Sequence, residues 1–278
     1  MIATAPLQNE IFNGNRAVGR IALSVAAMAG VSRRTRVHEA GDLRVRFPNG
    51  DREGALNAVI INTAGGMTGG DHFDIAVEVG AGARLAVTTA AAEKIYRSLG
   101  SDTQVSVRLK VRAGGSLAWL PQETIVFNRV RLRRSIEVEL ARDANLLLTE
   151  AAVFGRTAMG ETVMAGHFFD RRRVRVGGRL VFAETIRLDG QIAEWLAEPA
   201  IAAGAVAMAS VLKSPGDDEA VAAIRAMQQD FTGEVGVSAW NGLAVARLVA
   251  PDGAALRHDL ACVLAALGGE PPPRLWLN

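Results

Sequence analysis

The chain has 278 residues, of which 49% are hydrophobic, and a formal net charge of +2. This length is enough to bury a full core, in one large domain or two small ones. The sequence has no stretch of 18 apolar residues, which argues against a membrane span. It has only one cysteine, which argues against a disulfide framework. The start of the chain lacks both basic residues and an apolar run, so we expect no signal peptide and a cytoplasmic protein.

Arginine supplies 28 of the 31 basic residues, and these are interleaved with 29 acidic residues. A nucleic-acid-binding protein would show a one-sided basic stripe with aromatic residues, so we expect no nucleic-acid partner. The densest basic run is Arg171 to Arg173 with Arg175. It predicts a solvated strand end or turn, with contact to a partner protein as the alternative, because arginine pairs bidentately with carboxylates.

The first distinctive segment along the chain is NTAGGMTGGD at 62–71, which contains Gly65, Gly66, Gly69 and Gly70. A phosphate-binding loop of the Walker type needs a lysine after its glycines, and a dinucleotide fingerprint needs a helix directly after them. Here the following DHFDIAVEV alternates as a strand does, so no nucleotide site is predicted. Four glycines exceed what a turn requires, so we expect another element to approach this backbone closely.

Asp71 ends this loop and has the same strand parity as the apolar residues Phe73, Ile75 and Val77. Its carboxylate is therefore expected to point into the core. Burying a carboxylate is costly unless it is hydrogen-bonded, paired or metal-bound.

Four segments repeat one pattern, in which an alternating strand is followed by a small-residue or polar turn and a second strand that opens on leucine. The leucines are Leu85, Leu117, Leu146 and Leu180, spaced by 32, 29 and 34 residues, and Leu43 opens a weaker copy. A repeat of this length built from strands predicts stacked β layers or a β-helix-like coil, with the four leucines buried in adjacent strands.

Two observations extend the repeat. From 129 to 141 the even positions are apolar, with Arg134 as the one exception, and the odd positions through Glu139 are polar. This pattern predicts a half-buried strand that is bent or broken near Arg134. Four residues past each repeat leucine, on the same face, lie Thr89, Pro121, Glu150 and Glu184. Stacked coils would make the two glutamates neighbours, either as a polar track inside the apolar layer or as structural acids that reach solvent or pair with arginine.

Helix signals are confined to the C-terminal third. PGDDEAVAAIRAMQQDF has aspartates at its start, and AALRHDLACVLAALGG places leucines on one face and ends on glycine. We therefore predict a mainly β fold, a β-helix-like stack of strands in layers with two helices in the C-terminal third. Residues 1–278 are expected to form one domain.

Catalytic and tight metal sites are not predicted. The four histidines have no close spacing, and the sequence contains neither H-x-x-x-H, C-x-x-C nor G-x-S-x-G. We expect a protein that is not an enzyme and has no tightly bound cofactor.

Several blocks, in order, resemble the urease accessory protein family UreD, also called UreH. They are NTAGGMTGGD, VTTAAAEKIYRS, LAWLPQETIVF, AVFGRTAMGE and PPPRLWLN. The family usually reads T-T-Q-A-A-T-K where this chain has TTAAAEK, so Ala90 and Glu93 depart from the pattern. The W-x-x-x-R usual in the last helix is replaced by CVLAALGG.

The resemblance implies a non-enzymatic scaffold that joins UreF and the GTPase UreG, docks on apo-urease and helps deliver nickel. A dimer of heterotrimers is compatible with it, and no membrane partner is expected. Scattered carboxylates and hydroxyls bind Ni²⁺ less tightly than histidine or thiolate clusters do, so a transient path is expected to use Asp71, Thr88, Thr89, Glu150 and Glu184.

Glu123 and the four loop glycines are further candidate site residues. The alternative is a β-solenoid interaction module with no metal role, in which the acids are structural. A hydrolase or lyase on a β-helix would need clustered carboxylates in an exposed groove.

Overall fold

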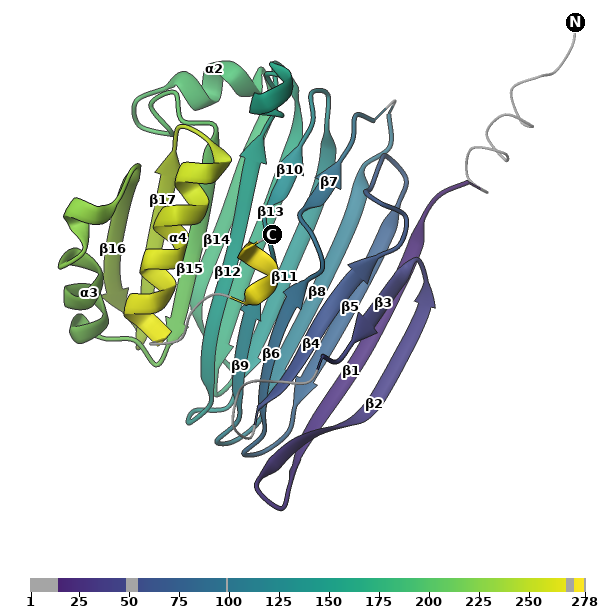
Figure 1. Ribbon diagram of the computed structural model, residues 1–278, viewed down its shortest axis with the longest axis vertical. Helices are drawn as coiled ribbons and strands as arrows, with labels where there is room; N and C mark the ends of the chain where they lie inside the picture. The colour runs from purple at the N-terminus through teal and green to yellow at the C-terminus, as the bar shows by residue number, and fades with distance from the viewer. Residues whose placement is uncertain (1–14, 49–54, 99, 269–272, 278) are drawn as a thin grey trace, which may run out of the picture.

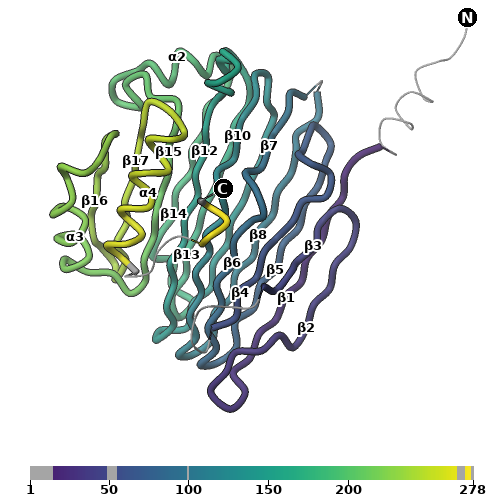
Figure 2. The backbone as a smooth tube through the Cα atoms, viewed as in Figure 1, coloured from purple at the N-terminus to yellow at the C-terminus, as the bar shows by residue number. Residues whose placement is uncertain are grey.

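The structure is a computed structural model that describes residues 15–48, 55–98, 100–268 and 273–277. It consists of two large β-sheets that lie face to face, with helices beside one of them (Figures 1 and 2). The seven-stranded sheet has the order β14 (Arg179–Gly190), β13 (Gly166–Val176), β11 (Arg131–Leu140), β8 (Thr103–Val111), β5 (His72–Val79), β1 (Val18–Met28) and β2 (Val31–Gly41).

The ten-stranded sheet has a main path of eight strands and a short side branch. The path runs β16 (Glu234–Trp240), β17 (Leu243–Ala250), β15 (Ala207–Ser214), β12 (Asn145–Phe154), β9 (Ser116–Leu120), β6 (Arg84–Thr89), β4 (Leu56–Asn62) and β3 (Leu43–Arg46). In the branch, β10 (Thr124–Val126) pairs with β12, and β7 (Glu93–Ile95) pairs with β10.

The chain alternates between the sheets, so that each sheet gains a parallel strand with every turn. β5, β8 and β11 are parallel neighbours in one sheet, and β6, β9 and β12 are parallel neighbours in the other. A parallel pair needs a crossover connection, and here a strand of the opposite sheet provides it. The result is a β-solenoid-like stack of about four turns, which confirms the predicted fold class. Antiparallel hairpins close both ends of the stack.

Three of the four repeat leucines lie where the repeat predicts. Leu85 is the cross-strand neighbour of Leu117, which is also the neighbour of Leu146, and each is at most 2% exposed in the core between the sheets. The weaker copy, Leu43, is buried in the same sheet, but its strand runs antiparallel to β4.

The prediction for Leu180 is wrong. This residue lies in β14 of the seven-stranded sheet and is 43% exposed. The pairing of β13 and β14 shifts register after Val174, which pairs with Phe182, whereas Leu180 pairs with Arg175. A one-residue bulge reverses which face a side chain occupies, so Leu180 points outward although Phe182 points into the core.

Strand β11 shows the predicted alternation, but it has no break at Arg134. Its residues pair one by one with β13 from Arg131 to Leu140. The even positions are buried throughout, including Arg134. The exception in the apolar pattern is therefore a buried arginine and not an interruption of the strand.

Both predicted helices are present as α3 (Asp218–Arg225) and α4 (Gly253–Gly268), and a third, α2 (Ile192–Ala197), was not predicted. The side chain of Asp217 caps α3 by accepting a hydrogen bond from the backbone N–H of Ala220. Helices α3 and α4 pack against β15, β16 and β17, on the outer face of the ten-stranded sheet (Figure 1). Short 3-10 turns are η1 (Thr157–Met159), η2 (Gln228–Asp230) and η3 (Arg274–Leu277).

The molecule therefore has two apolar cores. One fills the space between the two sheets, and the other lies between the ten-stranded sheet and its helices. Across the described ranges, none of the helices combines the length and apolarity that crossing a membrane requires.

Candidate functional site

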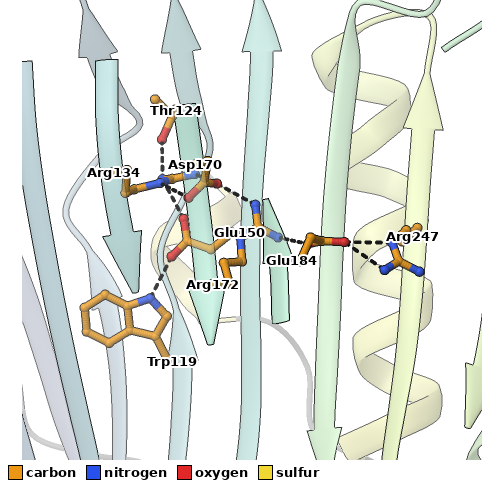
Figure 3. A network of polar contacts seen from close by, with 8 residues as sticks. All are labelled: Trp119, Thr124, Arg134, Glu150, Asp170, Arg172, Glu184 and Arg247. Carbon is orange, nitrogen blue, oxygen red and sulfur yellow. Dashed lines mark hydrogen bonds and ion pairs between the residues drawn. The ribbon is translucent and has the colours of Figure 1, made fainter. Parts of the chain in front are cut away.

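A line of alternating charges runs between the two sheets (Figure 3). It crosses from strand β12 of one sheet through β11, β13 and β14 of the other, and then returns to β17. Its members, in order of contact, are Glu150, Arg134, Asp170, Arg172, Glu184 and Arg247. We call these six residues the charge network.

Arg134 is the central cation of the charge network. One terminal nitrogen, Nη1, lies 2.6 Å from Glu150 Oε2, and the other, Nη2, lies 2.6 Å from Asp170 Oδ2. Its Nε donates to Asp170 Oδ1 at 3.1 Å, and Nη1 also donates to the hydroxyl of Thr124 at 3.2 Å. The second oxygen of Glu150 accepts a hydrogen bond from the indole N–H of Trp119 at 2.9 Å. Such charge-assisted bonds are the strongest that side chains make.

From Asp170 the charge network continues to the surface. Arg172 Nη2 lies 2.6 Å from Asp170 Oδ2, and Arg172 Nη1 lies 3.3 Å from Glu184 Oε2. The other oxygen of Glu184 lies 2.8 Å from Nη2 of Arg247. Side-chain exposure rises along this path, from 0% at Asp170 to 12% at Glu184 and 54% at Arg247. The charge network therefore links the interior to solvent at the β14 and β17 side of the molecule.

Burial and pairing act in opposite directions on the charges. Burial alone raises the pKa of Asp170, but the guanidiniums of Arg134 and Arg172 outweigh it and hold the pKa of that carboxyl well below its usual range. Burial lowers the pKa of Arg134, yet Asp170 and Glu150 raise it above its ordinary value. Both groups thus stay ionised, and three carboxylates balance three guanidiniums in the charge network.

A cavity of about 70 Å³ lies beside the inner end of the charge network, which is enough room for several water molecules. Glu150 and Arg134 form part of its lining, together with Asn62, Thr89 and Glu93. Glu93 accepts a hydrogen bond from Asn62 Nδ2 at 2.9 Å. Burial raises the pKa of this carboxyl, although the Asn62 hydrogen bond partly opposes the shift.

The structure joins two of the predicted acids, but not as predicted. Glu150 lies in the ten-stranded sheet and Glu184 in the seven-stranded sheet, so they are not neighbours on stacked coils. Both belong to the charge network, where Arg134, Asp170 and Arg172 separate them. The expectation of adjacent glutamates failed because β14 belongs to the opposite sheet from the first three repeat strands.

Asp71 is buried, as its strand parity predicts, with 4% exposure. Its two carboxylate oxygens accept backbone hydrogen bonds from Ala17 N at 2.9 Å and Thr68 N at 2.7 Å. These bonds close the glycine loop and tie it to the start of β1. Asp71 is therefore held apart from the charge network, with both oxygens already used.

The glycine loop confirms the expected close approach of another element. A Cβ at Gly66 would clash with the ring of Tyr96, and a Cβ at Gly69 would clash with Ser98 and stand 2.5 Å from the backbone oxygen of Ser101. Gly65, Gly66 and Gly70 also have positive φ, which glycine adopts without strain. The glycines thus allow Tyr96, Ser98 and Ser101 to pack on the loop.

The two candidate threonines point in opposite directions, as successive strand residues must. Thr89 lines the cavity, and its hydroxyl accepts a hydrogen bond from Gln122 N at 2.9 Å. Thr88 lies on the outer face, where its hydroxyl accepts a hydrogen bond from Trp276 Nε1 at 3.2 Å. Thr88 is therefore buried on the helix side of the sheet, and it does not line the cavity.

Glu123 also has an outward structural partner. Nη2 of Arg257, in α4, lies 2.6 Å from Glu123 Oε1 and 2.9 Å from Oε2. The same arginine donates through Nη1 to the backbone oxygen of Trp276 at 2.7 Å. This arrangement fastens α4 and the C-terminal turn to the solenoid.

Sequence reasoning missed Arg134, Asp170, Arg172 and Glu93 as parts of the site. Arg172 lies in a basic run that predicted a solvated strand end, yet it is 5% exposed. The available signal was parity, because Asp170 and Arg172 alternate with outward residues between the buried Phe168 and Val174. Within the described residues, no three His, Cys, Asp or Glu side chains come together in a way that could hold a metal ion.

Comparison with known proteins gives a consistent result. The family model described as "UreD urease accessory protein" matches residues 17–277. A protein named urease accessory protein UreD from Rhodopseudomonas palustris (strain HaA2) is 52% identical over 275 residues, covering 99% of this chain and 98% of the relative. A protein of the same name from Bradyrhizobium diazoefficiens is 52% identical over 270 residues, covering 97% of each. This chain belongs to the UreD family of urease accessory proteins.

Proposed function

We propose that this protein is a non-catalytic accessory protein of urease maturation, and that it acts as a nickel-delivery scaffold with UreF and the GTPase UreG on apo-urease. Membership of the UreD family supports the role in urease maturation. The partners and the delivery of nickel are the further content of the proposal. The charge network is the observation that carries it.

Stability alone gives little reason for burying so many charges. Replacing a buried ion pair by well-packed apolar residues is often neutral or stabilising, and the surrounding core is otherwise apolar. A path for a dication, in contrast, requires carboxylates in a low-dielectric interior, where desolvation of the ion is severe. The charge network supplies three carboxylates between a cavity and the surface.

The ligand chemistry suits a cargo that must be released. Nickel binds imidazole and thiolate clusters tightly, whereas carboxylate and hydroxyl oxygens hold it less strongly. We propose a path along Thr89, Glu93, Glu150, Asp170 and Glu184. Asp71 and Thr88 are left out because neither lines the cavity nor belongs to the charge network. A passing ion would replace a guanidinium as the partner of each network carboxylate, so displacement of Arg134 and Arg172 is part of the proposal.

A second candidate is an interaction module in which the acids are structural. The observation in its favour is that each carboxylate of the charge network already has an arginine partner. In that case the charge network would fix the relative position of the two sheets and would not contact nickel.

The test compares a Glu150→Gln, Glu184→Gln double variant with a matched control, Glu194→Gln with Glu234→Gln, at two exposed glutamates. Each chain is co-expressed with urease, UreF and UreG, and the nickel content and activity of the purified urease are measured beside a pull-down of the partners. A nickel path predicts a lower nickel content with the pull-down intact, in the first variant only. Full nickel loading would remove these residues from the path, and a lost pull-down would favour the interaction module.

A further inference from the structure

The outer face of the seven-stranded sheet has a surface chemistry that the proposal above does not use. In the described part of the chain, α3 and α4 cover the opposite sheet, so the outward side chains of β1, β5, β8, β11 and β13 are left at the surface. Arginine is prominent among them, and β13 alone presents Arg171, Arg173 and Arg175 on this side.

Three carboxylates of this region are each shared by two arginines, whereas Arg112 pairs with Glu78 and Lys110 with Glu139 one to one. Asp74 lies 2.7 Å from Nη2 of Arg108 and 3.7 Å from Nε of Arg20. The side chain of Asp74 is only 16% exposed, whereas those of Arg20 and Arg108 are 63% and 55% exposed. The carboxylate thus lies at the base, and the two guanidiniums extend above it.

The same arrangement occurs twice more along the sheet. Glu137 is shared by Arg171 at 3.2 Å and Arg175 at 3.5 Å. At the edge of the face, Asp102 is shared by Arg131 at 2.9 Å and Arg133 at 3.6 Å. Each group of three has one positive charge in excess, and each leaves N–H donors of its arginines without a carboxylate to bind.

A hollow of about 300 Å³ lies among these groups, over β1, β5, β8 and β11. Small side chains, including Ala22 and Ala76, line it together with charges of both signs. The basic lining residues are Arg36, Arg108 and Lys110, and the acidic ones are Glu78, Glu137 and Glu139. The hollow is therefore lined by charges of both signs, which suits a protruding polar segment of a partner protein.

We propose that this face docks an acidic protein surface, whose carboxylates pair with the excess guanidiniums while one protruding segment enters the hollow. Arginine suits this role because its fork binds carboxylates bidentately and is weakly hydrated. The partner is a protein and not a nucleic acid, because Asp74, Glu137 and Glu139 interrupt the arginines, whereas a nucleic-acid site presents a one-sided basic stripe with aromatic residues. The identification of the partner as a component of the urease maturation assembly rests on the proposed function.

The test uses the full chain in a pull-down with apo-urease, UreF and UreG, at low and at physiological salt. The variant Arg171→Glu with Arg175→Glu is compared with Arg84→Glu with Arg225→Glu, two exposed arginines outside the face whose replacement changes the net charge equally. Glutamates placed opposite the carboxylates of an acidic partner weaken association strongly. The first variant is therefore expected to retain about tenfold less partner in the pull-down than the unmodified chain does. The control is expected to retain it. A neutral variant, Arg171→Gln with Arg175→Gln, should show a smaller loss in the same direction without placing an acid beside Glu137.

Three results would overturn the proposal: equal retention by all variants, an equal loss in the control, or no retention by the unmodified chain. Binding of a short DNA duplex that only the first variant loses, with the protein partners retained, would assign the face to nucleic acid instead. The nickel content of urease is read separately in each case. A chain that retains its partners without raising the nickel content would refute nickel delivery and leave the docking face intact.

Discussion

Removing the central cation of the charge network should destabilise the protein strongly. The change is Arg134→Met, which keeps an apolar stem and deletes the guanidinium. Glu150 would then keep only the indole N–H of Trp119, and Asp170 would keep only Arg172. Breaking a buried ion pair from one side costs about 3–5 kcal/mol, and we expect a loss in this range because the Arg134 side chain is 8% exposed.

The matched control is Arg133→Met, one residue earlier on the same strand but facing outward. Its side chain is 51% exposed and lies 3.6 Å from Asp102, and its guanidinium stands over the ring of Phe169 at 4.8 Å. Exposed ion pairs and cation–π contacts each contribute about 1 kcal/mol or less. The free energy of unfolding in urea, measured for both variants, should therefore differ clearly between them.

The pH dependence gives a second measurement of the same reasoning. The pKa of Asp170 is lowered in the folded protein. The contribution of this carboxylate to the free energy of unfolding is therefore fully present above its ordinary pKa of 3.8, and it is lost as the pH falls toward the pKa of the folded state. The stability difference between the unmodified chain and Arg134→Met should thus shrink below about pH 4. A loss no larger than that of Arg133→Met at neutral pH would refute the claim that the charge network is desolvated and paired.

Three other predictions concern the core, the cavity and the glycine loop. Leu117→Ala should lower the free energy of unfolding by about 2–5 kcal/mol. Leu180→Ala should lower it by about 1 kcal/mol or less, because this side chain is 43% exposed. Urea unfolding of both variants checks this, and equal losses would contradict the assigned bulge. Burial raises the pKa of Glu93 in the folded protein. The contribution of this carboxyl to the free energy of unfolding is therefore fully present below its ordinary pKa of 4.5 and is lost as the pH rises. Glu93→Gln should therefore be more stable than the unmodified chain at neutral pH, with an advantage that grows above pH 4.5, in contrast to the exposed control Glu139→Gln; a stability difference that does not vary with pH would argue against a shifted Glu93. Gly69→Ala should destabilise the protein because a Cβ there meets Ser98 and the backbone oxygen of Ser101. An unchanged melting temperature would show that these two residues can shift away.

The amino-acid sequence by itself determined the class of the fold. Strand parity depends only on local alternation, so the buried faces of β5, β8 and β11 were predictable residue by residue. The near-regular spacing of Leu85, Leu117 and Leu146 predicted that their strands stack, because equal coil lengths bring equivalent positions side by side. The capping aspartate of α3 and the leucine stripe of α4 likewise gave local signals of helices.

Only the tertiary structure decided which charges meet. Parity shows that Arg134, Glu150, Asp170 and Glu184 point inward, but their ion pairs join strands of two different sheets and residues up to 63 positions apart. The repeat could not place Glu184, because a single bulge and the change to antiparallel pairing in β14 alter the face and the sheet without any clear mark in composition. The burial of a charged side chain depends on whether an opposite charge from a distant strand can reach it, and that partner is fixed by the packing of the two sheets and not by any local pattern.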